Sequence, residues 1–171
     1  MVNNNLDDLV LFTENPGCVI IDVRSESEFE LDHIPGSINF PVLNDDERKE
    51  VGTIYKKNPF TAKQLGARLI SSNISKILQK IEDLIEEKSI NPSKVEFKIY
   101  CWRGGMRSRS LFIVMEMIGY KVSLIKGGYK EYRKGIINYL SEFQSENLLV
   151  IHGLSGSGKT EILEILEKEH F

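Results

Sequence analysis

The chain has 171 residues, of which 41% are hydrophobic and 27% are charged, as in an ordinary globular protein. Its formal net charge of -3 excludes a surface that binds nucleic acid through a general positive field, so such binding requires local basic patches. The sequence shows no secretory signal, no apolar run long enough to cross a bilayer, and no clustering of its two cysteines and three histidines. We therefore expect a cytoplasmic protein with free thiols, no membrane contact and no structural metal.

Short apolar runs alternate with helical patterns along the chain. Runs typical of buried strands occupy residues 18–23, 37–40, 96–101, 121–125 and 148–152. The clearest helical periodicity covers residues 61–88, where leucine and isoleucine recur at spacings of three, four and seven, and further helices are predicted for 107–118 and 128–140. This alternation predicts an α/β fold with a parallel sheet flanked by helices, whose active residues lie at the carboxyl ends of strands.

A polar stretch without periodicity, residues 141–147, is the nearest feature to a domain boundary. We expect one domain over residues 1–140. Residues 141–171 are then a linker followed by a strand, a glycine-rich loop and a helix.

A cysteine, two glycines and three arginines crowd the stretch "YCWRGGMRSRS", residues 100–110. Cys101 ends a predicted strand, and a predicted helix begins near Arg107. Glycines let successive backbone N–H groups turn inward, and a helix N-terminus adds partial positive charge. Such surroundings lower a thiol pKa, so Cys101 is the predicted nucleophile. The predicted anion-binding loop around it consists of Trp102, Arg103, Gly104, Gly105, Met106 and Arg107.

Other residues near the strand ends receive structural interpretations. Asp22 and Arg24 are expected to hold a loop by hydrogen bonds, and His33 is expected to be a turn residue. Glu28 is likewise left out of the predicted catalytic set, and Cys18 is expected in the core. Trp102 either lines the pocket or covers the core.

The segment "IIDVRSESEFELDHIPGSINFP" resembles the opening signature of rhodanese-type sulfurtransferases, and a strand-terminal cysteine loop follows at the expected distance. The resemblance covers about residues 5–140. It implies that Cys101 is a nucleophile that carries a persulfide-like chalcogen.

One departure concerns loop length. Met106 stands five positions after Cys101, where ordinary sulfurtransferase loops carry an arginine or its equivalent, and Arg107 comes one position later. The Cys-x5-Arg spacing is that of rhodanese-like phosphatases and arsenate reductases, and a longer loop suits a larger anion. A phosphatase or arsenate reductase is therefore an alternative, although Tyr100 stands where cell-cycle phosphatases have histidine. A non-catalytic rhodanese-type module is a second alternative, against which the intact Cys101 argues.

The stretch "GLSGSGKT" fits the pattern G-x-x-x-x-G-K-[ST], between a predicted strand and a predicted helix. Its glycines would let backbone amides wrap a phosphate, its lysine would reach terminal phosphate oxygens, and Thr160 would hold Mg²⁺. The predicted phosphate-binding residues are Gly153, Gly156, Ser157, Gly158, Lys159 and Thr160. Since a complete P-loop domain needs further strands, we expect either a chain shorter than the native product or a separate chain that completes the domain.

A rhodanese-like module followed directly by a P-loop resembles the tRNA 2-selenouridine synthase family, and "VGTIYKKN" with the helix after it resembles that family's insertion. The resemblance implies a transferase that converts wobble 2-thiouridine of tRNA to 2-selenouridine through a geranylated intermediate. It implies geranyl diphosphate and selenophosphate as co-substrates, tRNA and a selenophosphate-supplying enzyme as partners, and Cys101 as the chalcogen carrier. The basic stretch 126–135 is interpreted as a solvated helix face, with contact to tRNA phosphates as the alternative.

Overall fold

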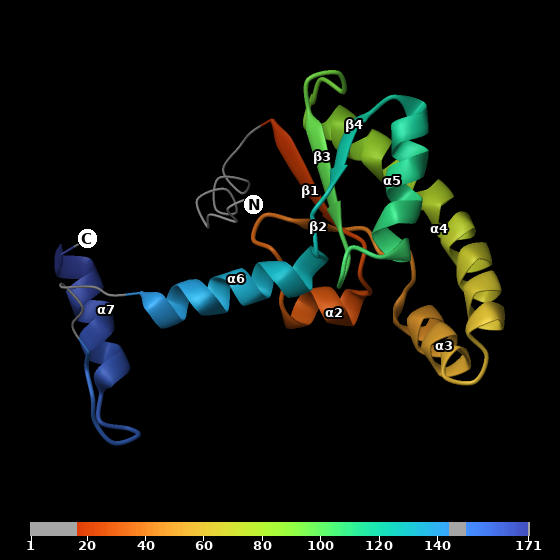
Figure 1. Cartoon of the computed structure of the whole chain (residues 1–171). Coiled ribbons are helices and arrows are strands. Elements are labelled where there is room, and N and C mark those ends of the chain that lie inside the picture. The colour runs from red at the N-terminus through yellow and green to blue at the C-terminus, as the bar shows by residue number, and fades with distance from the viewer. Residues whose placement is uncertain (1–16, 144–149, 171) are drawn as a thin grey trace. The chain divides into compact units, whose positions relative to one another are not determined.

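The computed structural model describes residues 17–143 and 150–170, and the chain divides into two compact units, residues 1–141 and 142–171. The sequence placed the boundary one residue earlier. The first unit contains the sheet and the cysteine loop. The second contains the glycine-rich loop and one helix (Figure 1).

Four parallel strands form the sheet of the first unit, in the order β2-β1-β3-β4. The strands are β1 (Cys18–Asp22), β2 (Ile38–Asn39), β3 (Glu96–Tyr100) and β4 (Lys121–Leu124). The helices between them are α2 (Glu26–Leu31), α3 (Asp45–Tyr55), α4 (Pro59–Glu87) and α5 (Met106–Ile118), and α6 (Gly128–Glu142) follows β4. The predicted α/β fold with a parallel sheet flanked by helices is confirmed.

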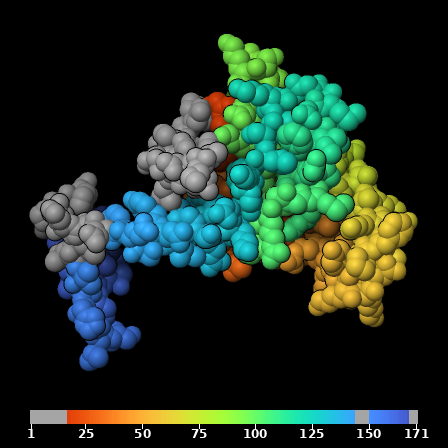
Figure 2. All heavy atoms as spheres, viewed as in Figure 1, coloured from red at the N-terminus to blue at the C-terminus, as the bar shows by residue number. Residues whose placement is uncertain are grey.

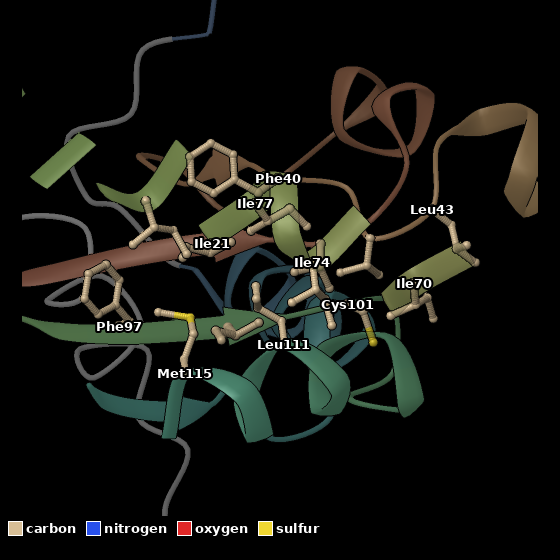
Figure 3. Close-up of a cluster of buried hydrophobic side chains, with 14 of the residues drawn as sticks. Ile21, Phe40, Leu43, Ile70, Ile74, Ile77, Phe97, Cys101, Leu111 and Met115 are labelled. Atoms are coloured by element: carbon tan, nitrogen blue, oxygen red, sulfur yellow. The ribbon is translucent and has the colours of Figure 1, made fainter. Parts of the chain in front are cut away.

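Consecutive strand residues point to opposite sides of the sheet, and helices cover both sides. Ile21 and Ile99 enter a cluster with α4 and α5 on one face, which Figure 3 shows. Ile20 and Tyr100 enter a second cluster with Tyr129 of α6 on the other face. The nearly continuous apolar runs of the sequence follow from this double burial.

Helix α4 begins where the sequence provides strong start signals. The Asn58 side chain accepts hydrogen bonds from the backbone N–H groups of Phe60 and Thr61, both at 3.1 Å. Pro59 occupies the first turn, where its missing N–H costs nothing. The buried residues recur every three or four positions and form one face against the sheet: Ala62, Gly66, Ile70, Ile74, Ile77, Ile81 and Leu84.

Two helices were not predicted from apolar periodicity, and both begin with a capping box. In α2 the backbone N–H of Ser25 donates to Glu28 Oε2 at 3.3 Å. In α3, Asn44 Oδ1 accepts from the Glu47 N–H at 2.8 Å and Glu47 Oε2 accepts from the Asn44 N–H at 3.0 Å. The sequence signal for these two helices therefore lies in the capping patterns S-x-x-E and N-x-x-E, and not in the spacing of apolar residues. Neither helix has a fully buried residue, which explains the weak periodicity.

A buried ion pair lies at the carboxyl end of β1. Arg24 Nη2 donates to Asp22 Oδ2 at 2.6 Å, and the two side chains are 1% and 0% exposed. The second contact of Arg24 Nη2 is the Asp32 carbonyl at 2.7 Å. Its guanidinium lies 4.0 Å from the centroid of the Tyr129 ring. Asp22 and Arg24 thus make the loop-holding hydrogen bonds that the sequence predicted.

One prediction for the second unit, the strand over residues 148–152, is wrong for its described residues. The described residues 150–152 of the predicted strand 148–152 form no strand, and residues 148–149 lie outside the described part. A strand needs a neighbour to pair with, and the described part of this unit has none to offer. The helix α7 (Lys159–His170) does form directly after the glycine-rich loop.

Within residues 17–143 and 150–170, no helix combines the length and apolarity needed to cross a bilayer. In the same residues, no group of three or more His, Cys, Asp or Glu side chains converges as metal ligands would.

Replacing Arg24 by methionine should destabilise the first unit by about 3–5 kcal/mol, because it leaves the Asp22 carboxylate buried without its partner. Urea unfolding followed by circular dichroism measures this change. Lys134→Met is the matched control, since the Lys134–Glu131 pair is long, at 4.0 Å, and both side chains are largely exposed. Equal stabilities for the two variants would contradict a structural role for the buried pair.

Candidate active site

Cys101 is the first residue after β3, at the carboxyl edge of the sheet. Its side chain is only 2% exposed and joins the buried cluster of α4 and α5. The Gly105 backbone N–H donates to Cys101 Sγ at 3.3 Å, and Ser108 Oγ lies 3.3 Å from the same sulfur. The loop therefore bends back so that the start of α5 faces the thiol.

Opposing effects act on the pKa of Cys101. Burial raises it, whereas hydrogen bonds from the Ser108 hydroxyl and from the backbone of Ser108 and Arg103, together with the charge of Arg107, lower it. The lowering effects prevail, so the pKa of the thiol lies below its ordinary value. Cys101 is thus a better nucleophile than an ordinary buried cysteine.

The first turn of α6 holds the cysteine loop from the other side. The Tyr129 backbone N–H donates to the Cys101 carbonyl at 2.9 Å, and the Lys130 N–H donates to the Trp102 carbonyl at 3.0 Å. Gly128 makes this approach possible, because a Cβ atom there would overlap the Cys101 carbonyl oxygen. Gly128 was not among the predicted site residues, although the Gly-Gly pair at the start of α6 is a sequence signal of a close approach.

The loop residues predicted from the sequence separate into different roles. Gly104 adopts φ +68°, which favours glycine, and lies against the backbone of residues 125–128. Trp102 is half-buried, with its ring centroid 5.6 Å from that of Tyr129, so it packs on the second cluster rather than standing free. The side chains of Arg103 and Met106 are exposed. Arg103 contributes its backbone to the thiol and not its guanidinium.

Glu28 belongs to the site although sequence reasoning left it out. Its Oε2 accepts from Arg107 Nη1 at 2.6 Å and from Arg48 Nε at 2.9 Å, so α2, α3 and α5 meet at this carboxylate. Burial raises the pKa of Glu28, but the hydrogen bond and charge of Arg107 and the charge of Arg48 outweigh it, and the net shift is downward. Glu28 therefore stays ionised and orients the guanidinium of the Cys-x5-Arg pattern. The S-x-x-E pattern from Ser25 to Glu28 indicates a helix cap and gives no sign of this contact with Arg107, 79 positions along the chain.

In the second unit, the glycine-rich loop encloses its own lysine. Lys159 Nζ donates to the Leu154 carbonyl at 2.6 Å, to the Gly153 carbonyl at 3.0 Å and to Ser157 Oγ at 3.3 Å. Gly156 and Gly158 adopt φ +78° and +75°, which side chains rarely accept. Thr160 is exposed in the first turn of α7. A helix N-terminus, a lysine ammonium and two left-handed glycines thus lie together, which is the arrangement of groups that phosphate needs.

A family model described as the rhodanese-like domain matches residues 5–135. The chain belongs to the rhodanese-like domain family. The match covers β1 through the first half of α6, and therefore the whole cysteine loop.

Several curated proteins that are similar to this chain carry the name tRNA 2-selenouridine synthase. The relative from Nitrosomonas eutropha (strain DSM 101675 / C91 / Nm57) is 38% identical over 176 residues, covering 99% of this chain and 43% of the relative. The relative from Bdellovibrio bacteriovorus (strain ATCC 15356 / DSM 50701 / NCIMB 9529 / HD100) is 38% identical, covering 92% of this chain and 40% of the relative. The chain spans about two fifths of the length of these relatives.

Among solved structures, the chain is similar to the crystal structure of the N-terminal domain of a Clostridium difficile 630 protein named for ATP/GTP binding. The identity is 34% and the TM-score 0.64, with 75% of this chain and 95% of that domain covered. The sheet and its helices are therefore those of a known domain.

Ser108→Ala should raise the pKa of Cys101, because it removes the hydrogen bond that stabilises the thiolate most, and Arg107→Gln should raise it by removing a positive charge. Thiolate absorbance at 240 nm against pH, taken as the difference from Cys101→Ser, measures the midpoint. Ser110→Ala and Arg109→Gln are matched controls on the same helix, since neither residue is among the causes of the shift. Equal midpoints in Ser108→Ala and Ser110→Ala would contradict the role of the hydroxyl.

Gly128→Ala should distort the cysteine loop, because the added methyl group meets the Cys101 carbonyl and φ +62° is strained for alanine. The φ strain alone costs about 1–3 kcal/mol, and the steric overlap adds to it. We expect a lower melting temperature and a shifted Cys101 midpoint. In Gly52→Ala, inside α3, the new methyl group meets nothing within 4 Å, so this control should melt no lower than the wild type. A Gly128→Ala variant that melts with the control would refute the close approach.

Proposed function

We propose that this chain is the rhodanese-like part of a cytoplasmic tRNA-modifying transferase that converts wobble 2-thiouridine to 2-selenouridine. The supporting observation is that a tRNA 2-selenouridine synthase aligns with 99% of the chain, so the similarity includes both the cysteine loop and the glycine-rich loop. Rhodanese-like character alone would account only for residues 5–135. The tRNA and the enzyme that supplies selenophosphate are the proposed partners.

The proposed reaction has two steps in the whole protein. Geranyl diphosphate first alkylates the sulfur of 2-thiouridine, with loss of diphosphate. Selenium from selenophosphate then forms a bond to C2 of the base, the C2–S bond breaks, and geranyl thiol leaves. Water cleaves the Se–P bond and releases phosphate. The second step needs a group that activates the selenium donor, and Cys101 is the nucleophile of this chain with donors placed around it.

Cys101 is proposed to carry the chalcogen as a perselenide. Forming an S–Se bond from a thiolate and selenophosphate, with release of phosphate, removes two electrons, so this route also needs a disulfide or another two-electron acceptor. A thiol must return two electrons when the S–Se bond breaks after transfer to the base. A second candidate follows from the Cys-x5-Arg spacing. If the thiolate attacks phosphorus, an S–P bond forms, the Se–P bond breaks and selenide leaves with its electron pair, with no change of oxidation state. Water then hydrolyses the phosphocysteine and restores the thiol.

The glycine-rich loop is proposed to bind phosphates of geranyl diphosphate or of the tRNA backbone. Its residues fit that role, because Lys159 Nζ already lies among loop oxygens and α7 begins at the loop. Thr160 would hold Mg²⁺, which would neutralise phosphate charge. The remainder of this P-loop domain is proposed to come from the rest of the protein or from a separate chain.

Intact mass of the reduced chain after exposure to selenophosphate, with and without a small-molecule disulfide as the two-electron acceptor, tests the role of Cys101. We expect an adduct in the wild type and in Cys18→Ser, and none in Cys101→Ser. Selenium and a phosphoryl group add almost the same mass, so the selenium isotope pattern and loss of the adduct on thiol treatment identify a perselenide. A thiol-stable adduct without that pattern identifies phosphocysteine. No adduct on a folded wild-type chain would count against any covalent role of Cys101 in the proposed function.

A further inference from the structure

Helices α3, α4 and α5 enclose a groove of about 740 Å³, within the roughly 300–1,000 Å³ of small-molecule pockets. Its apolar lining comes from all three helices and the segment before α3, and includes Leu43, Val51, Ala62, Ile70, Ile74 and Val114. The groove extends well beyond the cysteine loop and includes no residue of the glycine-rich loop. Neither step of the proposed reaction gives it a role. All of its lining lies in the first unit.

The groove reaches the cysteine loop. Met106 and Arg107, which end the Cys-x5-Arg pattern, line it. Leu43, Ile70 and Ile74 line the groove and also share the buried cluster of Cys101, and Figure 3 shows Cys101 at the end of the cluster where Leu43 and Ile70 lie. In Figure 2 the green loop and start of α5 adjoin the orange and yellow atoms of α3 and α4. A ligand in the groove would therefore have one end beside the site of chemistry.

Two glycines on facing helices keep the groove wide. Glycine is unfavourable inside a helix, so its presence at positions 52 and 66 needs a reason. Close packing does not explain these glycines. A Cβ atom at Gly52 would meet nothing within 4 Å, and a Cβ atom at Gly66 would make an ordinary 3.6 Å contact with Val51. Larger side chains at these positions would fill the space between α3 and α4. Both glycines line the groove.

The charges on the lining have one sign. Arg48 and Arg107 stand at the end near Cys101, and Lys56 and Lys63 stand near the turn between α3 and α4. No aspartate or glutamate is among the lining residues, although Glu28 pairs with both arginines from outside. An apolar floor with cationic ends complements an apolar chain that carries an anionic group. It does not suit a polar sugar or a cationic ligand.

We propose that this groove binds the hydrocarbon chain of an isoprenoid ligand, with the anionic or nucleotide end of the ligand at Arg107 and the cysteine loop. The inference rests on the proposed function, since it gives the geranyl group a place beside the residue that handles selenium. A chain held there keeps the C–S bond of the modified base near Cys101 while water is excluded from the apolar part. The groove thereby selects geranylated over unmodified 2-thiouridine.

The test measures binding of geranyl diphosphate to the full 171-residue chain by titration calorimetry, with inorganic pyrophosphate as the head-group control. The wild type should bind geranyl diphosphate at least tenfold more tightly than pyrophosphate. Gly52→Leu places a side chain in the groove and should lose at least tenfold in affinity, while Gly52→Ala should keep most of it. Because leucine favours a helix more than glycine does, Gly52→Leu should melt no lower than the wild type.

Three outcomes would overturn the inference. In the first, geranyl diphosphate and pyrophosphate bind the wild type equally. In the second, Gly52→Leu keeps full affinity and Lys159→Ala loses it, which assigns the ligand to the glycine-rich loop. In the third, Gly52→Leu changes only the concentration dependence of sedimentation, which makes the groove a contact between copies of the chain. The selenophosphate adduct on the wild type is measured separately, so failure of the cysteine chemistry and failure of the groove are told apart.

Discussion

The buried guanidinium of Arg24 is the interaction on which the cysteine loop depends. It is paired with Asp22 at the end of β1, bonded to the carbonyl of Asp32 after α2, and stacked on the ring of Tyr129 at the start of α6. The Tyr129 hydroxyl in turn donates to the Asp32 carboxylate. A charge can stay in the interior only when such partners surround it, so these elements are held in one arrangement.

That arrangement positions the Cys101 thiol from two sides. On one side the backbone N–H of Tyr129, the residue stacked on Arg24, holds the Cys101 carbonyl. On the other side the start of α5 supplies the Gly105 N–H and the Ser108 hydroxyl to the sulfur. Burial by itself would make the thiol inert, and the local donors reverse that effect. The Cys101 thiol is thus buried and has a lowered pKa. This combination suits a covalent carrier that is shielded from oxidants in the solvent.

The ion pairs of Glu28 connect the cysteine loop to the groove. Glu28 holds Arg107 and Arg48 together, and both arginines line the groove at the end next to Cys101. The same guanidinium therefore lowers the pKa of the thiol and forms part of the groove wall. An anionic ligand group at the proposed site would compete with Glu28 for Arg107, so ligand binding and thiol reactivity are expected to depend on each other.

Local patterns in the sequence determined the alternation of strands and helices, the placement of Cys101 at a strand end and the glycine-rich loop, because each depends on neighbours a few positions apart. They also contained the capping boxes that begin α2 and α3, although apolar periodicity alone overlooked those helices. Tertiary structure decided which arginine of the cysteine loop acts on the thiol: of Arg103, Arg107 and Arg109, it is Arg107 that pairs with Glu28 and lowers the pKa of the thiol through its charge. It also decided the docking of Gly128 on the cysteine loop and the groove between three helices. These features join segments brought together by the sheet, and no spacing along the chain encodes that proximity.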